Sequence, residues 1–266
     1  MSAVTPLTSD QLREYLQFAE DLMHRAGEIA RRHFSHDIAV EVKTEDNTPL
    51  TIADTAINQL VIDEVSARYP QIGVLGEEAS KEVDSPDKLL WVCDPIDGTI
   101  PYSLHLPMST GCLALVHDGV PVVGVVYDYM ADRMFSAYKG SGARLNGQPF
   151  TPDAGTTMKM IDMESWPASV VDVKNLRATL LAAAYQLPNF CSYAYTCMLV
   201  AQGRIEGAVY AGAKPWDGAA SKVILGELGI LMTDARGQEP RFDGSLYGLL
   251  TARPETHELL VSALAE

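Results

Sequence analysis

The chain has 266 residues, of which 47% are hydrophobic and 21% are charged. This composition is typical of a globular chain that can bury a substantial core, as one large domain or as two closely packed halves. The formal net charge of −15 excludes binding to nucleic acid or to an anionic membrane through a generic basic surface. No apolar run reaches the ~18 residues that a membrane-spanning helix needs.

The termini and cysteines give a first indication of the compartment. The N-terminal segment MSAVTPLTSD has neither the basic nor the apolar region of a secretory signal. Cys93, Cys112, Cys191 and Cys197 are scattered and form no CxxC pair. Both observations favour a reduced, cytoplasmic setting.

The first part of the chain is expected to begin with a long amphipathic helix. Thr8 and Gln11 have the spacing of a capping box, and apolar residues then recur at helical spacing to about Phe34. The elements expected next are a strand over 38–42, a loop over 43–50, a helix over 51–69, and strands over 72–75 and 89–93.

The middle of the chain is predicted to be rich in β-structure. Two apolar strands flank His117-Asp118-Gly119, which is a strong hairpin signal, and a third strand ends in a turn over 139–142. The pattern changes near Phe150. The elements expected after it are a strand around Met160, helices near 175–185, 193–202 and 217–228, a strand near Leu249 and a last helix over 255–264.

The order of these elements indicates the fold class. Runs of helix, then sheet, then mixed elements predict layered α+β packing rather than strict βαβ alternation. No internal repeat or flexible linker divides the chain. We therefore expect a single domain over 1–266, with an α+β half over about 1–150 and an α/β half over about 151–266.

The segment Asp94-Pro95-Ile96-Asp97-Gly98-Thr99 carries the strongest chemical signal. The apolar strand before it should deliver Asp94 to a strand end beside the core, where a carboxylate is costly unless it is paired or binds metal. Pro95 is expected to end the strand, Asp97 to return toward Asp94, and Gly98 to allow close approach of a ligand. Thr99 should begin a short helix, whose N-terminus favours anions. Two carboxylates beside an anion site predict hard cations that bridge protein and phosphate.

Three further acidic positions follow or begin predicted elements. Glu77 follows a short apolar strand, Asp217 begins a helix after Pro215, and Asp54 forms a possible capping box with Thr51. The alternative for each position is an ordinary structural acid that is solvated or caps a helix. Other mechanisms lack their signatures, because the chain has no GxxxxGK[ST] loop, no GxSxG elbow, no HExxH and no Asp-x-Asp phosphatase motif.

These segments, taken together, resemble the inositol monophosphatase family. The matching residues are Gly76-Glu77-Glu78, Asp94 to Thr99, and Trp216-Asp217-Gly218-Ala219-Ala220, in this order and separation. The segment from Lys43 to Asp54 looks like the loop before the second helix of the family, especially in its adenosine 3′,5′-bisphosphate branch. The resemblance spans nearly the whole chain. It implies a layered αβαβα fold of the inositol monophosphatase and fructose-bisphosphatase type, usually dimeric, lithium-sensitive and dependent on Mg²⁺.

The resemblance also implies a set of roles for individual residues. One Mg²⁺ would bind Glu77, Asp94 and the carbonyl of Ile96, a second would bind Asp94, Asp97 and Asp217, and a third, looser ion would lie near Glu77. Two ions about 3.5–4 Å apart can bind the attacking and the leaving oxygen of an in-line displacement. Asp54 and Thr99 would orient and deprotonate the attacking water, while the backbone of Gly98 and Thr99 would hold the phosphate, with Asp97 and Asp217 close to the substrate.

The chain departs from the family pattern on the side that recognises the alcohol. Pro101-Tyr102 stands where a polar residue and an aromatic are common, and Tyr193 lies in the small-residue turn. Tyr210 stands where inositol-specific members carry a sugar-binding glutamate. We expect Tyr193 and Tyr210 either to contact the substrate or to serve as ordinary packing residues.

The sequence therefore predicts a phosphoric monoester hydrolase with two to three Mg²⁺ ions. Its expected partner is a small phosphorylated metabolite, namely a sugar, cyclitol or amino-alcohol phosphate, and its expected assembly is a cytoplasmic homodimer. Two alternatives remain open at this point: a 3′(2′),5′-bisphosphate nucleotidase, and a non-catalytic regulatory or binding protein on the same fold.

Overall fold

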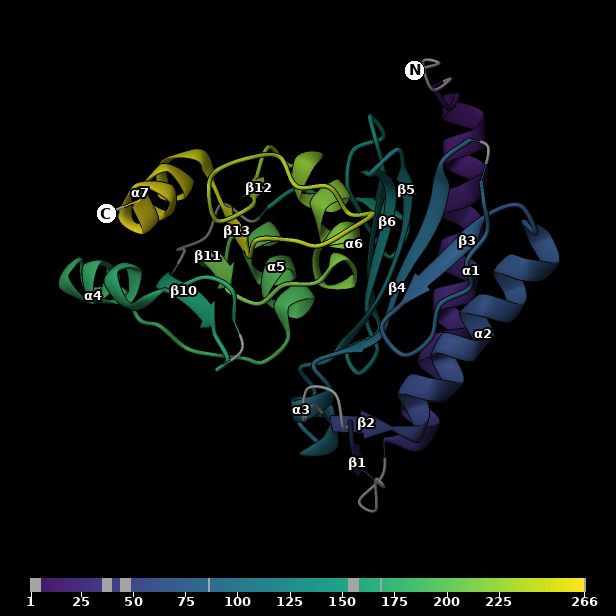
Figure 1. Ribbon diagram of the computed structural model, residues 1–266, viewed down its shortest axis with the longest axis horizontal. Coiled ribbons are helices and arrows are strands. Elements are labelled where there is room, and N and C mark those ends of the chain that lie inside the picture. The colour runs from purple at the N-terminus through teal and green to yellow at the C-terminus, as the bar shows by residue number, and fades with distance from the viewer. Residues whose placement is uncertain are drawn as a thin grey trace.

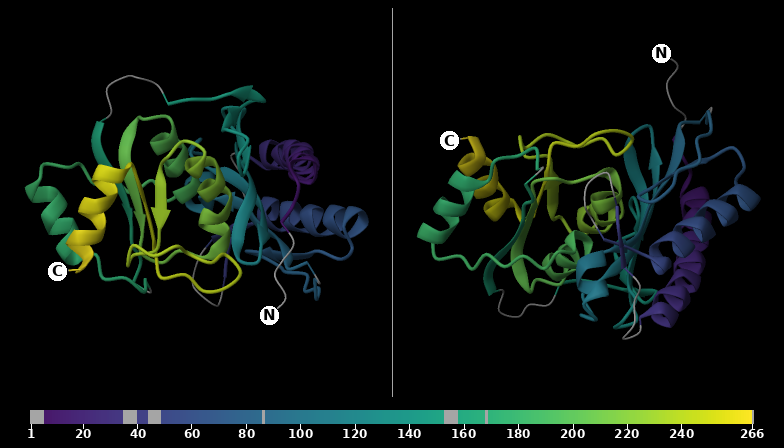
Figure 2. Two further views of the ribbon diagram at one scale, coloured as in Figure 1. Left: turned by 90° about the horizontal axis from the view of Figure 1, so that it is seen from above. Right: turned by 60° about the horizontal axis from the view of Figure 1, so that its bottom comes forward.

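The computed structural model describes residues 6–34, 40–43, 49–85, 87–152, 158–167 and 169–265. Its helices and sheets stack in five alternating layers, and the further views show the same stack from above and below (Figures 1 and 2). Helices α1 and α2 form one outer layer, and α4 and α7 form the other. The expected αβαβα architecture is thereby confirmed.

Helices α1 (Ser9–His33) and α2 (Ile52–Arg68) cover the outer face of the first sheet. The predicted capping box at the start of α1 is present, since Thr8 Oγ1 accepts from the backbone of Gln11 and Gln11 Oε1 accepts from the backbone of Thr8. A two-stranded ribbon, β1 (Val40–Val42) and β2 (Pro49–Thr51), leads into α2. The part of the predicted strand over 38–39 lies outside the described residues.

The first sheet has seven strands in the order β3-β4-β5-β6-β7-β8-β9. The predicted hairpin joins β5 and β6 through Asp118 and Gly119, both with positive φ, as a tight two-residue turn requires. The bounds of the strands are β3 Gly73–Gly76, β4 Leu89–Asp97, β5 Thr110–His117, β6 Val120–Asp128, β7 Arg133–Tyr138, β8 Arg144–Leu145 and β9 Gln148–Pro149.

The second sheet has four strands in the order β10-β11-β13-β12, with β10 and β11 parallel. Helices α5 and α6 separate the two sheets, and α4 and α7 cover the outer face of the second (Figure 1). The bounds are β10 Met158–Glu164, α4 Lys174–Ala182, α5 Tyr193–Ala201, β11 Ile205–Tyr210, α6 Pro215–Gly226, β12 Leu231–Thr233, β13 Leu249–Ala252 and α7 Pro254–Ala265. Strands β11 and β12 were not expected from the sequence.

Each interface between layers has its own apolar core. One lies between α1, α2 and the first sheet, a second surrounds α5 and α6 between the sheets, and a third lies between the second sheet and its outer helices. No helix in the described ranges has both the length and the apolar character to cross a membrane.

Candidate active site

A pocket of about 100 Å³ opens where β3, β4 and the start of α3 (Thr99–Ser103) meet the ends of β10 and β11 and the start of α6. Five carboxylates line it, and its described lining includes no Lys or Arg. Such a surface repels a phosphate unless cations lie between them. The lining residues are Pro49, Glu77, Asp94, Ile96, Asp97, Gly98, Thr99, Ile100, Glu164, Trp166, Cys191, Tyr210 and Asp217.

A β-bulge places Asp94 and Asp97 on one face of the first sheet. Asp94 pairs with Cys112 and Asp97 with Thr110, so Pro95 and Ile96 together oppose a single residue of β5. Residues two apart on β5 face the same side, and their partners therefore do so too. The prediction that Pro95 ends the strand is wrong, because β4 continues through the bulge to Asp97.

Asp94 is 2% exposed, and its Oδ1 has no hydrogen-bond partner. Burial, with added repulsion from Glu77, Asp97 and Asp217, raises the pKa of Asp94 well above its usual value. A buried carboxylate oxygen without a donor, surrounded by like charges, is an arrangement that a bound cation would stabilise.

The carboxylate of Asp97 faces the N-terminus of α5. Its Oδ1 accepts from the backbone of Tyr193 at 3.0 Å, and its Oδ2 accepts from the backbone of Ala194 at 3.1 Å and from the hydroxyls of Ser192 and Thr110. Burial raises the pKa of Asp97, and these hydrogen bonds oppose the rise. Asp97 is thus held in a fixed orientation between the two sheets.

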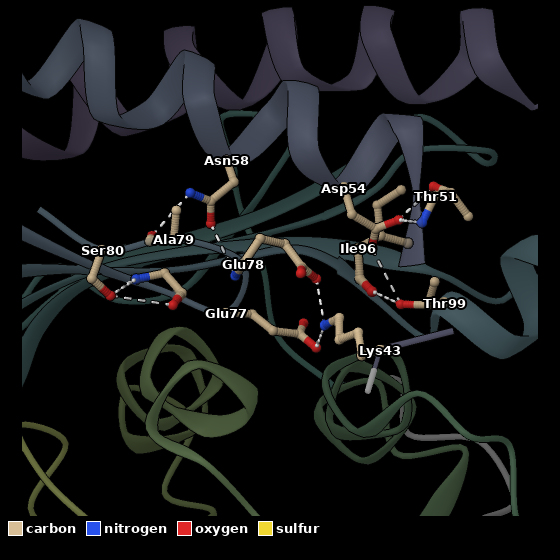
Figure 3. Close-up of polar contacts among 11 residues, drawn as sticks. Lys43, Thr51, Asp54, Asn58, Glu77, Glu78, Ala79, Ser80, Ile96 and Thr99 are labelled. Carbon is tan, nitrogen blue, oxygen red and sulfur yellow. Dashed lines mark hydrogen bonds and ion pairs between the residues drawn. The ribbon is translucent and has the colours of Figure 1, made fainter. Parts of the chain in front are cut away.

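Lys43 bridges the two glutamates that follow β3 (Figure 3). Its Nζ lies 2.8 Å from Glu77 Oε1 and 2.6 Å from Glu78 Oε1. Burial lowers the pKa of Lys43, but the two carboxylates outweigh it, so the net pKa is raised. For Glu78 burial dominates, and its pKa rises to about 7. Glu77 therefore already has one positive partner in this structure.

Asp54 lies behind the pocket wall and reaches the pocket through Thr99 (Figure 3). Its Oδ2 accepts from the backbone of Thr51 at 2.8 Å, and its Oδ1 accepts from Thr99 Oγ1 at 3.2 Å. The Thr99 hydroxyl also lies 3.1 Å from the carbonyl oxygen of Ile96. Burial raises the pKa of Asp54 to about 6. The helix-capping contact and the link to Thr99 are both present.

Asp217 and Gly98 also line the pocket, where the sequence analysis expected them beside the phosphate. Asp217 lies in the first turn of α6, where its Oδ2 accepts from the backbone of Lys214 at 2.6 Å, and burial raises its pKa well above the usual value. Gly98 has φ of +89°, and a Cβ there would lie 2.7 Å from the Cβ of Ser192. Only glycine fits this position without strain.

The residues present fit divalent cations, although no three Asp, Glu, His or Cys side chains among the described residues converge closely enough to hold an ion as they stand. Glu77 is paired with Lys43 and Asp217 with a backbone N–H. The donor set is oxygen only, and Asp94 retains a free oxygen, which suits a hard ion.

The opposite wall contains residues that the sequence did not identify. Glu164 ends β10 and pairs in register with Tyr210 of the parallel strand β11, so both side chains face the same side. Trp166 and Cys191 lie beside them in the pocket lining. The sequence placed a strand near Met160, but nothing in it showed that this strand ends at the pocket, since the pairing partner β11 was not expected.

The two tyrosines of the expected alcohol side have different positions. Tyr210 lines the pocket, whereas Tyr193 is fully buried outside its lining. The Tyr193 hydroxyl lies 2.8 Å from Thr251 Oγ1, and its ring centroid is 5.5 Å from that of Tyr210. Substrate contact by the Tyr193 side chain does not fit this position, because the side chain packs behind Tyr210. Tyr102 is also buried, and its hydroxyl donates to the carbonyl of Ala30.

Comparison with known proteins gives one family. A family described as the inositol monophosphatase family matches residues 11–266. A histidinol-phosphatase of Chlorobaculum parvum is 32% identical over 94% of this chain and 96% of its own length. Inositol monophosphatase 1 of Solanum lycopersicum is 30% identical over 95% of each chain. The solved structure of a Thermotoga maritima IMPase superposes with a TM-score of 0.81 at 25% identity, covering 95% of this chain and 97% of that one.

The architecture, the acidic pocket and the match along nearly the whole chain agree with one another. The chain belongs to the inositol monophosphatase family and is a phosphoric monoester hydrolase.

Proposed function

We propose that this protein hydrolyses a small phosphate monoester with Mg²⁺ as cofactor, releasing inorganic phosphate and an alcohol. The observation that carries the proposal is the pocket itself, in which five carboxylates and no described Lys or Arg surround a buried, unpaired Asp94 oxygen. A phosphate dianion binds such a site only together with cations.

Glu77, Asp94, Asp97, Asp217 and the carbonyl of Ile96 would hold the ions. When bound, Mg²⁺ supplies positive charge that neutralises the phosphate and favours deprotonation of water. Asp97 needs little reorganisation, because α5 already fixes its carboxylate. Glu77 would exchange Lys43 for an ion.

The protein's own proton path runs through Thr99 and Asp54. The Thr99 hydroxyl donates to Asp54 Oδ1 and offers its lone pairs to the attacking water. As the water oxygen bonds to phosphorus and the bond to the alcohol oxygen breaks, the water proton moves to Thr99 and the Thr99 proton moves to Asp54. The leaving oxygen takes a proton from solvent. The left-handed turn at Gly98 leaves the backbone of Gly98 and Thr99 free of bulk on the pocket side, so these two residues would hold the phosphate.

The pocket has a volume of about 100 Å³ and opens to solvent, so part of the substrate can extend beyond it. The expected leaving group is a small alcohol. The naming of one relative for inositol phosphate and another for histidinol phosphate supports the same class.

The test is phosphate release from a panel of monoesters, namely inositol 1-phosphate, histidinol phosphate, fructose 1,6-bisphosphate and adenosine 3′,5′-bisphosphate. We expect turnover of at least one small monoester with Mg²⁺ and none in excess chelator. We expect Ca²⁺ to bind and inhibit, because its looser coordination misplaces the water. Highest kcat/KM on the adenosine bisphosphate would favour the nucleotidase alternative, and no turnover of any substrate would favour the non-catalytic one.

A further inference from the structure

Glu164 is the one carboxylate of the described pocket lining that the proposed metal ligands do not include. It lies on the second sheet, at the end of β10, whereas Glu77, Asp94 and Asp97 come from the first sheet and its loops. If the ions and the phosphate bind at the carboxylates of the first sheet and at Asp217, the leaving alcohol would lie toward the wall that carries Glu164 and Tyr210. The inference therefore rests on the proposed function.

Half of the Glu164 carboxyl group lacks a partner. The residue is 5% exposed, its Oε1 accepts from Trp166 Nε1 at 3.1 Å, and its Oε2 has no hydrogen-bond partner. Leaving a buried carboxyl oxygen without a hydrogen-bond donor is unfavourable. Such a group in a pocket wall is a site for a ligand that supplies the missing donor.

The surroundings of Glu164 favour a cationic donor. The aromatic rings of Tyr210 and Trp166 lie in the same wall, and the described lining offers no Lys or Arg as a competing partner. An anionic carboxyl with aromatic faces is the combination that binds ammonium groups, through an ion pair and cation–π attraction. A ring with hydroxyl groups all round would instead need several placed polar partners.

We infer that Glu164, together with Tyr210 and Trp166, forms a subsite for a positively charged amino group on the leaving alcohol, so that the substrate is an amino-alcohol phosphate. Burial, with added repulsion from Asp97 and Asp162, raises the pKa of Glu164 to about 8. A bound ammonium would stabilise the ionised form and complete the hydrogen bonding of Oε2.

The wild-type enzyme tests the inference without mutation. Straight-chain aminoalkyl phosphates of increasing length are compared with hydroxyalkyl phosphates of the same length at neutral pH. At the best length we expect kcat/KM to favour the amino compound by roughly 10-fold or more. Inositol 1-phosphate should be a poorer substrate than that amino compound. Equal hydrolysis of each pair would overturn the inference and leave the proposed function intact, whereas no hydrolysis of either would contradict the proposed function.

Two variants test whether Glu164 causes the preference for the aminoalkyl phosphate. Glu164→Gln keeps the shape and one acceptor oxygen for Trp166 but removes the charge, and it should lower the amino-to-hydroxyl ratio of kcat/KM by roughly 10-fold. The control is Asp162→Asn, because Asp162 is a buried carboxyl on the same face of β10 that lies outside the pocket lining and accepts from the backbone of Phe190. It should leave the ratio unchanged.

Two other results for Glu164→Gln would overturn the inference. If Glu164→Gln raised the Mg²⁺ concentration needed for half-maximal rate and slowed both compounds equally, Glu164 would belong with the metal ligands and the inference would fall. The same holds if Glu164→Gln left the ratio at its wild-type value. If Glu164→Gln failed to fold, the wild-type series would still decide the preference by itself.

Discussion

A single carboxylate, that of Asp97, connects the first sheet to helix α5. It accepts from the backbone of Tyr193 through Oδ1 and from Ala194, Ser192 and Thr110 through Oδ2. Because each oxygen already faces a donor, an amide nitrogen at either position would oppose an N–H or hydroxyl group. The residue is therefore structural as well as chemical, and its replacement tests both roles at once.

Asp217 offers a cleaner test of the metal ligands. In Asp217→Asn the remaining oxygen can still accept from the backbone of Lys214, so the helix start is kept while one negative charge is lost. We expect kcat to fall at least roughly 100-fold, measured as phosphate release in saturating Mg²⁺. The control is Glu239→Gln, since Glu239 forms an ion pair with Lys222 of α6 and lies outside the pocket lining. A near wild-type kcat for Asp217→Asn at low Mg²⁺ would show that the ligand assignment is wrong.

Substitution of Thr99 tests its hydrogen bond to Asp54. Thr99→Val preserves the shape but removes the link to Asp54, so kcat should fall by roughly 10²–10⁴. Thr99→Ser, which keeps the hydroxyl, should retain most of the activity. If the valine variant matched the serine variant, the proton path would not run through this residue.

The pH profile of the wild-type enzyme reports on the same path. Asp54 accepts a proton only when it is ionised, so kcat/KM should rise with pH across the pKa of Asp54. That pKa is raised to about 6 by burial, and nearby cations would lower it, so the midpoint should lie at or below about 6. The rise should be absent in Thr99→Val. A midpoint well above neutrality would exclude Asp54 as the acceptor.

At the scale of elements, strong periodicity predicted the helices and the β5–β6 hairpin, whereas weak patterns failed. Strand β11 contains Glu206 and Gly207, which interrupt the pattern of a regular strand. Glycine suits position 207 nevertheless, because a Cβ there would lie only 2.8 Å from the carbonyl oxygen of Thr251. Close packing against the neighbouring strand β13, rather than a sequence pattern, accounts for strand β11. For that reason Glu164, whose place in the pocket depends on the pairing of β10 with β11, could not be predicted, whereas Tyr210 was named from the resemblance to the family.

The bulge in β4 is a similar case. The sequence showed two acids separated by Pro95 and Ile96, and it predicted correctly that they converge. It predicted wrongly that the strand ends at Pro95, because whether the chain turns or continues depends on the register against β5. The acids of the phosphate side could be picked out because motif and element ends coincide, while Glu164 carried no motif.

Lys43 directly follows β1 and is expected to compete with a metal ion for Glu77. Its ammonium group holds Glu77 and repels a second cation, so Lys43→Met should lower the Mg²⁺ concentration for half-maximal rate by roughly 2- to 10-fold. The control is Lys81→Met, since Lys81 donates to Ser66 and lies outside the pocket lining. An unchanged or higher Mg²⁺ requirement in Lys43→Met would show that Lys43 does not compete with the metal.

At the scale of the whole molecule, the acidic pocket couples folding to pH and to cations. The pKa of Asp54 is raised from 3.8 to about 6 and that of Glu164 from 4.5 to about 8, so the folded state binds more protons than the unfolded state. The free energy of unfolding should therefore fall as pH rises from about 4 to 8. For Asp54 alone, a rise of about two pKa units corresponds to a loss of about 3 kcal/mol.

Calorimetric melting in chelator checks this effect. We expect Tm to decrease from pH 5.5 to 8, and we expect Mg²⁺ to recover most of the loss at pH 8, because an ion that binds only the folded state stabilises it. Glu164→Gln should show a weaker dependence on pH above neutrality than the wild type. A Tm that rises with pH in chelator would contradict the account of the pocket.

In the proposed function these carboxylates bind Mg²⁺, and the bound ions make the protein a phosphatase. The most direct measurement is a Mg²⁺ titration of one preparation, followed in parallel by calorimetric binding and by phosphate release from a small monoester. We predict that binding and activity rise together and that both are greatly weakened in Asp217→Asn. Full phosphate release in excess chelator, or activity without detectable Mg²⁺ binding, would contradict the account.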